Sequence, residues 1–206
     1  MQFKKDSGLI GAAVTLVILL GLSSLVAHNL TTWTLEVFPI FIALPILVFT
    51  YRVFPLTNIV YIFIFLHALL LMVGGIYSYA KVPFGFYIAD IFHLSRNPYD
   101  KIGHFFQGLV PALIAREILI RGDYVRGKKM LSFVVICIVL AISATYELIE
   151  WGAAMALGQG ADEFLGTQGD PWDTQSDMLF AVIGAMAALM FVRVHDRQID
   201  ALPRIK

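Results

Sequence analysis

Three short motifs hold most of the ionisable side chains that could do chemistry in this 206-residue chain. They are Asp100-Lys101-x-x-His104, Glu147-x-x-Glu150 and Asp173-x-x-x-Asp177. Spacings of three or four residues keep the members of each motif on one face of a helix. Carboxylates combined with one imidazole form an oxygen-rich donor set that suits Zn²⁺, Mn²⁺ or Fe²⁺. The motifs therefore indicate either a divalent-metal site or a hydrogen-bonded acid–histidine network.

The residues of this cluster have different expected roles. The expected metal ligands are His104, Glu147, Glu150 and Asp177. Asp100 and Asp173 are interpreted as supporting residues or helix caps, because negative charge is favourable at a helix N-terminus. Lys101 and Arg96 are candidate counter-charges, or candidate ligands for a lipid phosphate.

Glu147 and Glu150 are the members that helix capping does not explain. The apolar run that contains them is predicted to end at Trp151, which places both acids at a helix C-terminus. The helix dipole disfavours negative charge there. We therefore expect a cation, either a side chain or a metal, or a bound proton to compensate this pair.

The composition shows what kind of structure must position these motifs. Hydrophobic residues make up 59% of the chain, against about 45–50% in soluble domains. Mean hydropathy is +0.78. Such a chain is expected to lie in the lipid bilayer. The formal net charge of zero argues against a nucleic-acid partner. The single cysteine, Cys137, excludes an intramolecular disulfide.

The apolar segments predict an all-α polytopic membrane bundle with six transmembrane helices, forming one integral membrane domain over residues 1–206. A helical span needs about 20 apolar residues. The six segments run near Leu9–Ala27, Leu35–Phe54, Leu56–Ile76, Asp100–Ile120, Met130–Trp151 and Thr174–Val194. A stretch around Pro83–Leu94 is predicted to be re-entrant or interfacial.

The distribution of lysine and arginine predicts the orientation, because these residues concentrate in cytoplasmic loops. With both termini in the cytoplasm, the inner side carries Lys4, Lys5, Arg52, Arg116, Arg121, Arg126, Lys128, Lys129, Arg193, Arg197, Arg204 and Lys206. The outer side then carries only Lys81, Arg96 and Lys101. All three acidic motifs would lie near the outer, periplasmic side.

Two similar stretches predict where the fourth and sixth spans begin. They are Asn97-Pro98-Tyr99-Asp100 and Asp170-Pro171-Trp172-Asp173. Each has a capping residue followed by a proline, which is favoured in the first turn of a helix. We expect Asn97 to be the N-cap of the fourth span and Asp170 to play the same part for the sixth.

Three motifs, in this order, carry a resemblance to a known family. They are Arg96-Asn97-Pro98-Tyr99-Asp100-Lys101-Ile102-Gly103-His104-Phe105, Tyr146-Glu147-Leu148-Ile149-Glu150-Trp151 and Gly169-Asp170-Pro171-Trp172-Asp173-Thr174-Gln175-Ser176-Asp177-Met178. With them the chain resembles, over nearly its whole length, the YjdF-type bacterial inner-membrane proteins. This family has no established activity, so the resemblance implies a multi-pass inner-membrane protein and no reaction.

A looser similarity is to the VanZ-like membrane proteins, which share an Asp-Lys-x-x-His-Phe start. Asp100, Lys101, His104 and Phe105 match that start. Two later positions depart from the VanZ-like pattern: Trp151 stands where glutamine is expected, and Ala181 stands where asparagine is expected.

Three functions are compatible with these observations. The first is a metal-dependent enzyme that acts on a lipid or a lipid-linked substrate at the outer leaflet. The second is a non-catalytic scaffold or partner subunit, in which the polar cluster only locks helices together. The third, a proton or cation transporter, is the weakest, because the inner halves of the same spans lack a matching polar relay. The sequence indicates no particular protein partner and does not identify a substrate.

Overall fold

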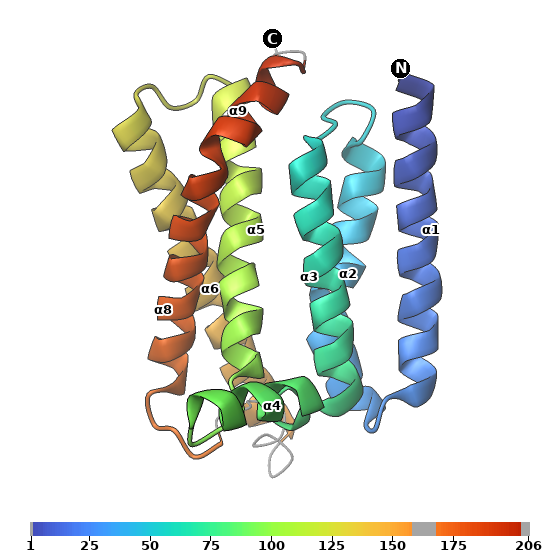
Figure 1. Ribbon diagram of the computed structural model, residues 1–206, viewed down its shortest axis with the longest axis vertical. Helices are drawn as coiled ribbons and strands as arrows, with labels where there is room; N and C mark the ends of the chain where they lie inside the picture. Colours follow the sequence, from blue (N-terminus) through green and yellow to red (C-terminus); the bar gives the residue numbers. More distant parts are fainter. Residues whose placement is uncertain (1, 158–167, 203–206) are drawn as a thin grey trace.

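The computed structural model describes residues 2–157 and 168–202, and every element in this part of the chain is helical. The elements are α1 (Gln2–Val26), α2 (Leu30–Thr50), α3 (Asn58–Tyr77), η1 (Tyr79–Lys81), α4 (Pro83–Phe92), α5 (Tyr99–Arg121), α6 (Lys128–Leu157), α8 (Asp173–Ala188), η3 (Leu189–Phe191) and α9 (Val192–Asp200). The long helices run side by side, and α4 lies across one end of the bundle (Figure 1). The start of α1 and the end of α9 lie at the opposite end.

Five helices in the described ranges are long and apolar enough to cross a membrane. They are Ser7–Val26, Leu30–Thr50, Asn58–Tyr77, Lys128–Ala156 and Asp173–Asp200. The remaining predicted span corresponds to α5, which has 23 residues but is not among these five. Its charged residues explain why: Asp100, Lys101, Arg116, Glu117 and Arg121.

Helix α5 is polar because it is the internal helix of one half of the bundle. It packs against α3, α6 and α8. Lys101, Arg116, Glu117 and Arg121 are all buried. These charges contact protein, so they lower the hydropathy of α5 although the helix lies inside the bundle.

A helix follows each of the two stretches, but the predicted N-caps were wrong: the N-cap of α5 is Pro98 and that of α8 is Trp172, one and two residues after the predicted positions, and neither makes a side-chain cap hydrogen bond. The Asn97 Oδ1 atom accepts a hydrogen bond of 3.0 Å from the Tyr99 N–H, and α5 begins at Tyr99. The Asp170 Oδ1 atom accepts one of 2.9 Å from the Trp172 N–H, and α8 begins at Asp173. The similarity of the two stretches is therefore a shared turn before the helix, in which a side-chain oxygen accepts from the N–H two residues further on.

The predicted end of the fifth span was wrong. Helix α6 continues to Leu157, so Glu147 and Glu150 lie about three and two turns before its end. The dipole acts mainly within the last turn. The helix dipole therefore does not destabilise the carboxylates of Glu147 and Glu150. Their negative charge needs compensation because they are buried among other acids.

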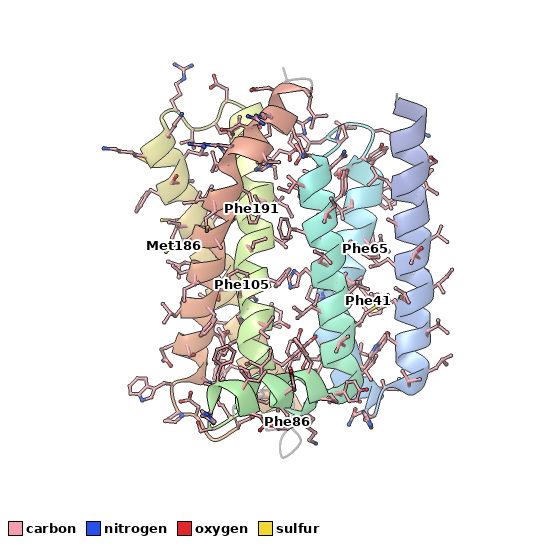
Figure 2. The ribbon with its side chains drawn as sticks, viewed as in Figure 1. Phe41, Phe65, Phe86, Phe105, Met186 and Phe191 are labelled. Carbon is pink, nitrogen blue, oxygen red and sulfur yellow. The ribbon has the colours of Figure 1, made fainter. Side chains whose placement is uncertain are left out.

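The bundle has two apolar cores that share α3. One core joins α1, α2 and the C-terminal half of α3, and the other joins α3, α5, α6 and α8. In Figure 2, Phe65 lies in the first half, while Phe105 and Phe191 lie in the second. Phe86 on α4 lies at the end of the bundle, and 49% of its side chain is exposed.

The most extensive helix–helix contact joins α5 and α8. A Cβ atom on Gly108 of α5 would overlap the carbonyl oxygen of Ala181, and one on Gly184 of α8 would overlap that of Phe105. Small residues allow backbones to approach closely in lipid, where packing replaces the hydrophobic effect. This crossing brings the first turns of α5 and α8 together.

A second polar network closes the end of the bundle where α9 lies. Glu117 of α5 accepts hydrogen bonds of 3.1 Å from the Thr57 N–H and 2.8 Å from the Thr57 hydroxyl. It also pairs with Arg121 at 2.8 Å and lies 3.2 Å from Nε2 of His195 on α9. Glu117 is fully satisfied by these partners, so we interpret this network as structural.

Gly108→Ala and Gly184→Ala should each destabilise the protein, because the added methyl group must push two backbones apart. A loss of about 1–3 kcal/mol is expected for such overpacking. The free energy of unfolding in detergent micelles, followed by circular dichroism, measures it. Gly21→Ala on α1 is the matched control, because a Cβ there meets nothing within 4 Å. Equal effects of all three changes would contradict this account of the α5–α8 contact.

Candidate functional site

The predicted acid–histidine cluster forms where α5, α6 and α8 meet, near the end of the bundle that α4 covers. His104 is the sixth residue of α5, and Asp177 is the fifth residue of α8. Both therefore lie within about 8 Å of the start of their helices. His104 is 5% exposed and Asp177 is 2% exposed, so the centre of the cluster is buried.

One edge of the His104 ring faces two aspartates. Its Nε2 atom lies 3.5 Å from Oδ1 of Asp100 and 3.7 Å from Oδ1 of Asp177. These distances are longer than the 2.7–3.2 Å of ordinary hydrogen bonds. Two ligand atoms that each lie about 2.1 Å from one tetrahedral ion are about 3.4 Å apart. The spacing is therefore compatible with three ligands around one metal ion, and equally with ion pairs between a protonated imidazole and the two aspartates.

The other edge of the ring faces Gln107 and α6. The Nδ1 atom lies 2.9 Å from Oε1 of Gln107 and 3.7 Å from Oε1 of Glu147. An Nδ1–H that donates to Gln107 leaves the Nε2 lone pair directed at the two aspartates. Metal-binding histidines usually make such a second hydrogen bond, which fixes the tautomer and the ring orientation.

The sequence-predicted residues thus fall into two groups of three that share His104. Ligand atoms of Asp100, His104 and Asp177 lie within 4.8 Å of one another, and so do those of His104, Glu147 and Glu150. Each predicted ligand lies in one of the two groups, but Asp177 is grouped with His104 and Asp100 and not with Glu147 or Glu150. Because Gln107 already occupies Nδ1, the group that contains the two aspartates has the better geometry for an ion.

Arg96 and Lys101 pair with aspartates at the outer edge of the cluster. Lys101 Nζ lies 2.6 Å from Oδ1 of Asp173 and 2.6 Å from Oδ1 of Asp177. Arg96 contacts Asp170 at 2.9 Å and Asp173 at 2.7 Å. Asp173 is therefore held by two cations. The two basic side chains serve as counter-charges, and this leaves Lys101 little capacity to bind a phosphate.

Glu147 and Glu150 have no such support. In the described part of the chain, no lysine or arginine forms an ion pair with either residue. The Glu147 Oε1 atom is buried and has no hydrogen-bond partner among the described residues. An unpaired buried acceptor is costly. This oxygen is therefore directed at a position where a donor or a cation would be stabilised.

Glu36 of α2 is a further acid that the sequence reasoning missed. It is 4% exposed and interacts electrostatically with Glu150, Asp100 and His104. Its Cβ atom borders Gly75 of α3. The sequence feature that could have identified Glu36 is that it is an isolated glutamate within an apolar span. Such a residue rarely lacks a functional or structural role.

Tyr79, in the connection after α3, links Glu36 to the rest of the cluster. Its ring packs where Cβ atoms on Gly74 of α3 and Gly103 of α5 would lie. Burial, followed by the nearby carboxylate of Glu36, raises the pKa of the Tyr79 phenol well above its ordinary value. Tyr79 therefore stays neutral and adds no charge to the cluster.

Acids outnumber bases in this region. Five carboxyl groups surround His104: Glu36, Asp100, Glu147, Glu150 and Asp177. Lys101 pairs with only one of the five. An ionised carboxylate in a region of low dielectric needs a nearby positive charge. The arrangement can therefore hold a cation, or protons in place of one.

Comparison with known proteins identifies relatives of the chain. Residues 9–197 match the family described as predicted membrane protein (DUF2238). The chain is also 60% identical over 189 residues to the inner membrane protein YjdF of Escherichia coli (strain K12). That alignment covers 91% of this chain and 90% of the relative. No solved structure gives a significant match.

Lys101→Met should destabilise the protein, because Asp177 would keep a buried charge without its partner. Breaking one side of a buried pair typically costs about 3–5 kcal/mol. Unfolding in detergent micelles, followed by intrinsic fluorescence, measures the loss. Arg126→Met is the control, since the Arg126–Asp123 pair is largely exposed and should contribute little. A Lys101 variant as stable as this control would contradict the role of Lys101 as a counter-charge.

Proposed function

This chain belongs to the DUF2238 family of predicted membrane proteins, and on that premise we propose that its acid–histidine cluster is a divalent-metal site at the outer face of the bacterial inner membrane. The proposed activity is that of a metal-dependent enzyme acting on a lipid or lipid-linked substrate. The observation that carries the proposal is the spacing of His104 from Asp100 and Asp177. That spacing is too long for hydrogen bonds and close to the separation of ligands on one ion.

The proposed topology has six spans in a single membrane domain, with α5 as the internal span and both termini in the cytoplasm. Twelve of the fifteen lysines and arginines then lie on the inner side, as the positive-inside rule requires. The start of α1 and the end of α9 lie at the same end of the bundle, which an even number of spans requires (Figure 1). The acidic cluster would then face the periplasm.

In this proposal the ion is held by Nε2 of His104 and by carboxylate oxygens of Asp100 and Asp177. One imidazole and two carboxylates suit Zn²⁺, Mn²⁺ or Fe²⁺. Gln107 orients the ring, and Lys101 orients Asp177 through its 2.6 Å contact. Such an ion would supply Lewis-acid activation of water or of a phosphoryl or carbonyl oxygen.

Glu147 is the proposed proton acceptor. Its Oε1 atom lies 3.7 Å from His104 and has no hydrogen-bond partner within the described residues. A general base must lie within hydrogen-bonding reach of the proton that it removes. Glu150, one turn along α6, would raise the affinity of the same region for protons or cations.

A second candidate function is a scaffold, and the bridging lysine favours it. Lys101 of α5 holds two aspartates of α8 at 2.6 Å each, and Arg96 ties the segment before α5 to the start of α8. Such ion pairs fix helices together without catalysis. A scaffold needs no metal, so metal content separates the two functions.

The purified protein should bind about one divalent ion per chain after stripping with chelator and reloading with Zn²⁺, Mn²⁺ or Fe²⁺. Elemental analysis by mass spectrometry measures the ion-to-protein ratio. His104→Ala and Asp177→Asn should lose the ion, because each removes a proposed ligand. Glu147→Gln should keep it, because Glu147 is proposed as the base.

Asp90→Asn is the control for this measurement, since Asp90 is an exposed acid of α4 outside the cluster. It should bind the ion as the parent protein does. A parent protein without stoichiometric metal, together with a His104→Ala variant of reduced stability, would reject the enzyme and support the scaffold.

The topology can be tested with reporter fusions. A green fluorescent protein fused to the C-terminus should fluoresce, because it folds in the cytoplasm. Alkaline phosphatase fused after Leu94 should be active, since that position is proposed to face the periplasm. The reverse pattern would place the acidic cluster on the cytoplasmic side.

A further inference from the structure

Two glutamates of α6 and one of α2 form a separate acidic group beside His104. Ligand atoms of Glu147, Glu150 and the His104 ring lie within 4.8 Å of one another. Glu36 faces this group from α2, and Glu150 is the charged side chain that interacts with it most strongly. Three carboxyl groups from two helices are thus directed toward one region.

The Glu147 carboxylate is held in place with one oxygen left over. The hydroxyl group of Thr174 on α8 donates a hydrogen bond to this carboxylate. The Oε1 atom is buried and has no hydrogen-bond partner among the residues that the structure describes. Glu147 as a whole is only 9% exposed. An acceptor that is both buried and unpaired is costly, so this oxygen requires a partner.

The neighbouring side chains do not supply that partner. The Nδ1 atom of His104 lies 3.7 Å from Oε1 of Glu147, which is longer than a hydrogen bond. It lies only 2.9 Å from Oε1 of Gln107, so its N–H is directed there. Among the described residues, the basic side chains at this end of the bundle pair with aspartates and not with Glu36, Glu147 or Glu150.

One divalent ion does not balance the charge of this region. Two basic side chains, Arg96 and Lys101, accompany seven carboxyl groups: Glu36, Asp100, Glu147, Glu150, Asp170, Asp173 and Asp177. An ion at His104 and the two basic side chains supply four positive charges, so three negative charges stay uncompensated when all seven groups are ionised. Buried carboxylates need positive charge nearby. The three acids without a basic partner or a place around that ion are Glu36, Glu147 and Glu150.

We propose that Glu36, Glu147 and Glu150 bind a second cation, of the hard class that takes oxygen ligands, and that Ca²⁺ fits best. A carboxylate can bind Ca²⁺ through one or both oxygens, so three of them supply much of the about six to eight ligands that Ca²⁺ takes. Mg²⁺ usually keeps several water molecules, which a buried position does not provide. This donor set has no nitrogen and therefore differs from the site at His104, which suits Zn²⁺, Mn²⁺ or Fe²⁺.

The second cation would connect the two halves of the bundle. Helix α2 packs on α1 and α3, whereas Glu147 and Glu150 belong to α6 in the other half. The site does not require an ion at His104, because Oε1 of Glu147 lacks a partner in either case. It shares Glu147 with the proposed proton transfer, so Glu147 accepts a proton only after this cation has left.

Equilibrium dialysis of the full-length protein against radioactive Ca²⁺ tests the proposal. The protein is purified in an uncharged detergent and stripped with chelator. We expect about one bound Ca²⁺ ion per chain. Ca²⁺ should also raise the midpoint temperature of thermal unfolding, because a ligand that binds only the folded state stabilises it. Protein preloaded with Zn²⁺ should bind Ca²⁺ equally well, since His104 is not a ligand of the second cation.

Variants separate the two cation sites. Glu36→Gln and Glu147→Gln should each weaken Ca²⁺ binding by at least about tenfold, since even changes around a metal ligand cost that much. Both should unfold in chelator no earlier than the parent protein, because each removes an uncompensated charge and keeps the shape of the side chain. Glu147→Gln should still bind Zn²⁺, whereas His104→Ala should lose Zn²⁺ and keep Ca²⁺. Asp90→Asn, which changes an exposed acid of α4, is the control and should bind both ions.

A parent protein that binds no Ca²⁺ and unfolds at the same temperature in chelator and in Ca²⁺ would show that protons alone compensate these acids, and would overturn the inference. Equal loss of Ca²⁺ from His104→Ala and Glu147→Gln would mean one shared site and would overturn it too. Ca²⁺ binding without Zn²⁺ binding would reject the proposed metal enzyme and keep the second site. Zn²⁺ binding without Ca²⁺ binding would do the reverse.

Discussion

The close contact between α5 and α8 is the constraint on which the polar cluster depends. Gly108 and Gly184 let the two backbones meet, and this places the first turns of both helices side by side. Only then can Lys101 reach Asp177, and only then does Asp177 face His104. Packing in lipid is driven by close fit rather than by exclusion of water. The geometry of the site is therefore set by two residues that have no side chain.

The cluster also illustrates how a membrane protein stabilises charge away from water. At the outer edge, Arg96 and Lys101 pair with three aspartates in a chain of ion pairs, which leaves one negative charge in excess. Further in, several acids gather around a single histidine, and of the acids in its two groups only Asp177 pairs with a lysine or arginine among the described residues. Moving an unpaired charge into such surroundings is expensive. The inner part of the cluster thus has an excess of negative charge, which a bound cation or protons would offset.

Sequence reasoning identified the membrane class, the family resemblance and the approximate positions of the long helices that the structure describes, because apolar length is a local signal. The resemblance to YjdF-type proteins is confirmed by the family match and by 60% identity to the Escherichia coli protein. The end of α6 was misplaced, because Gly152 and the following small residues give no strong stop signal. Glu36 and Gln107 were missed, because their proximity to His104 depends on tertiary packing that no spacing in the sequence encodes.

The burial of charge on α5 also has a consequence for how the protein is made. A helix with five lysine, arginine, aspartate and glutamate residues gains little by entering lipid alone, since each charge opposes insertion. The groups that neutralise Lys101, Arg116 and part of Glu117 belong to α8 and α9, which are synthesised later. The polar contacts of α5 are therefore complete only once the C-terminal helices have been synthesised.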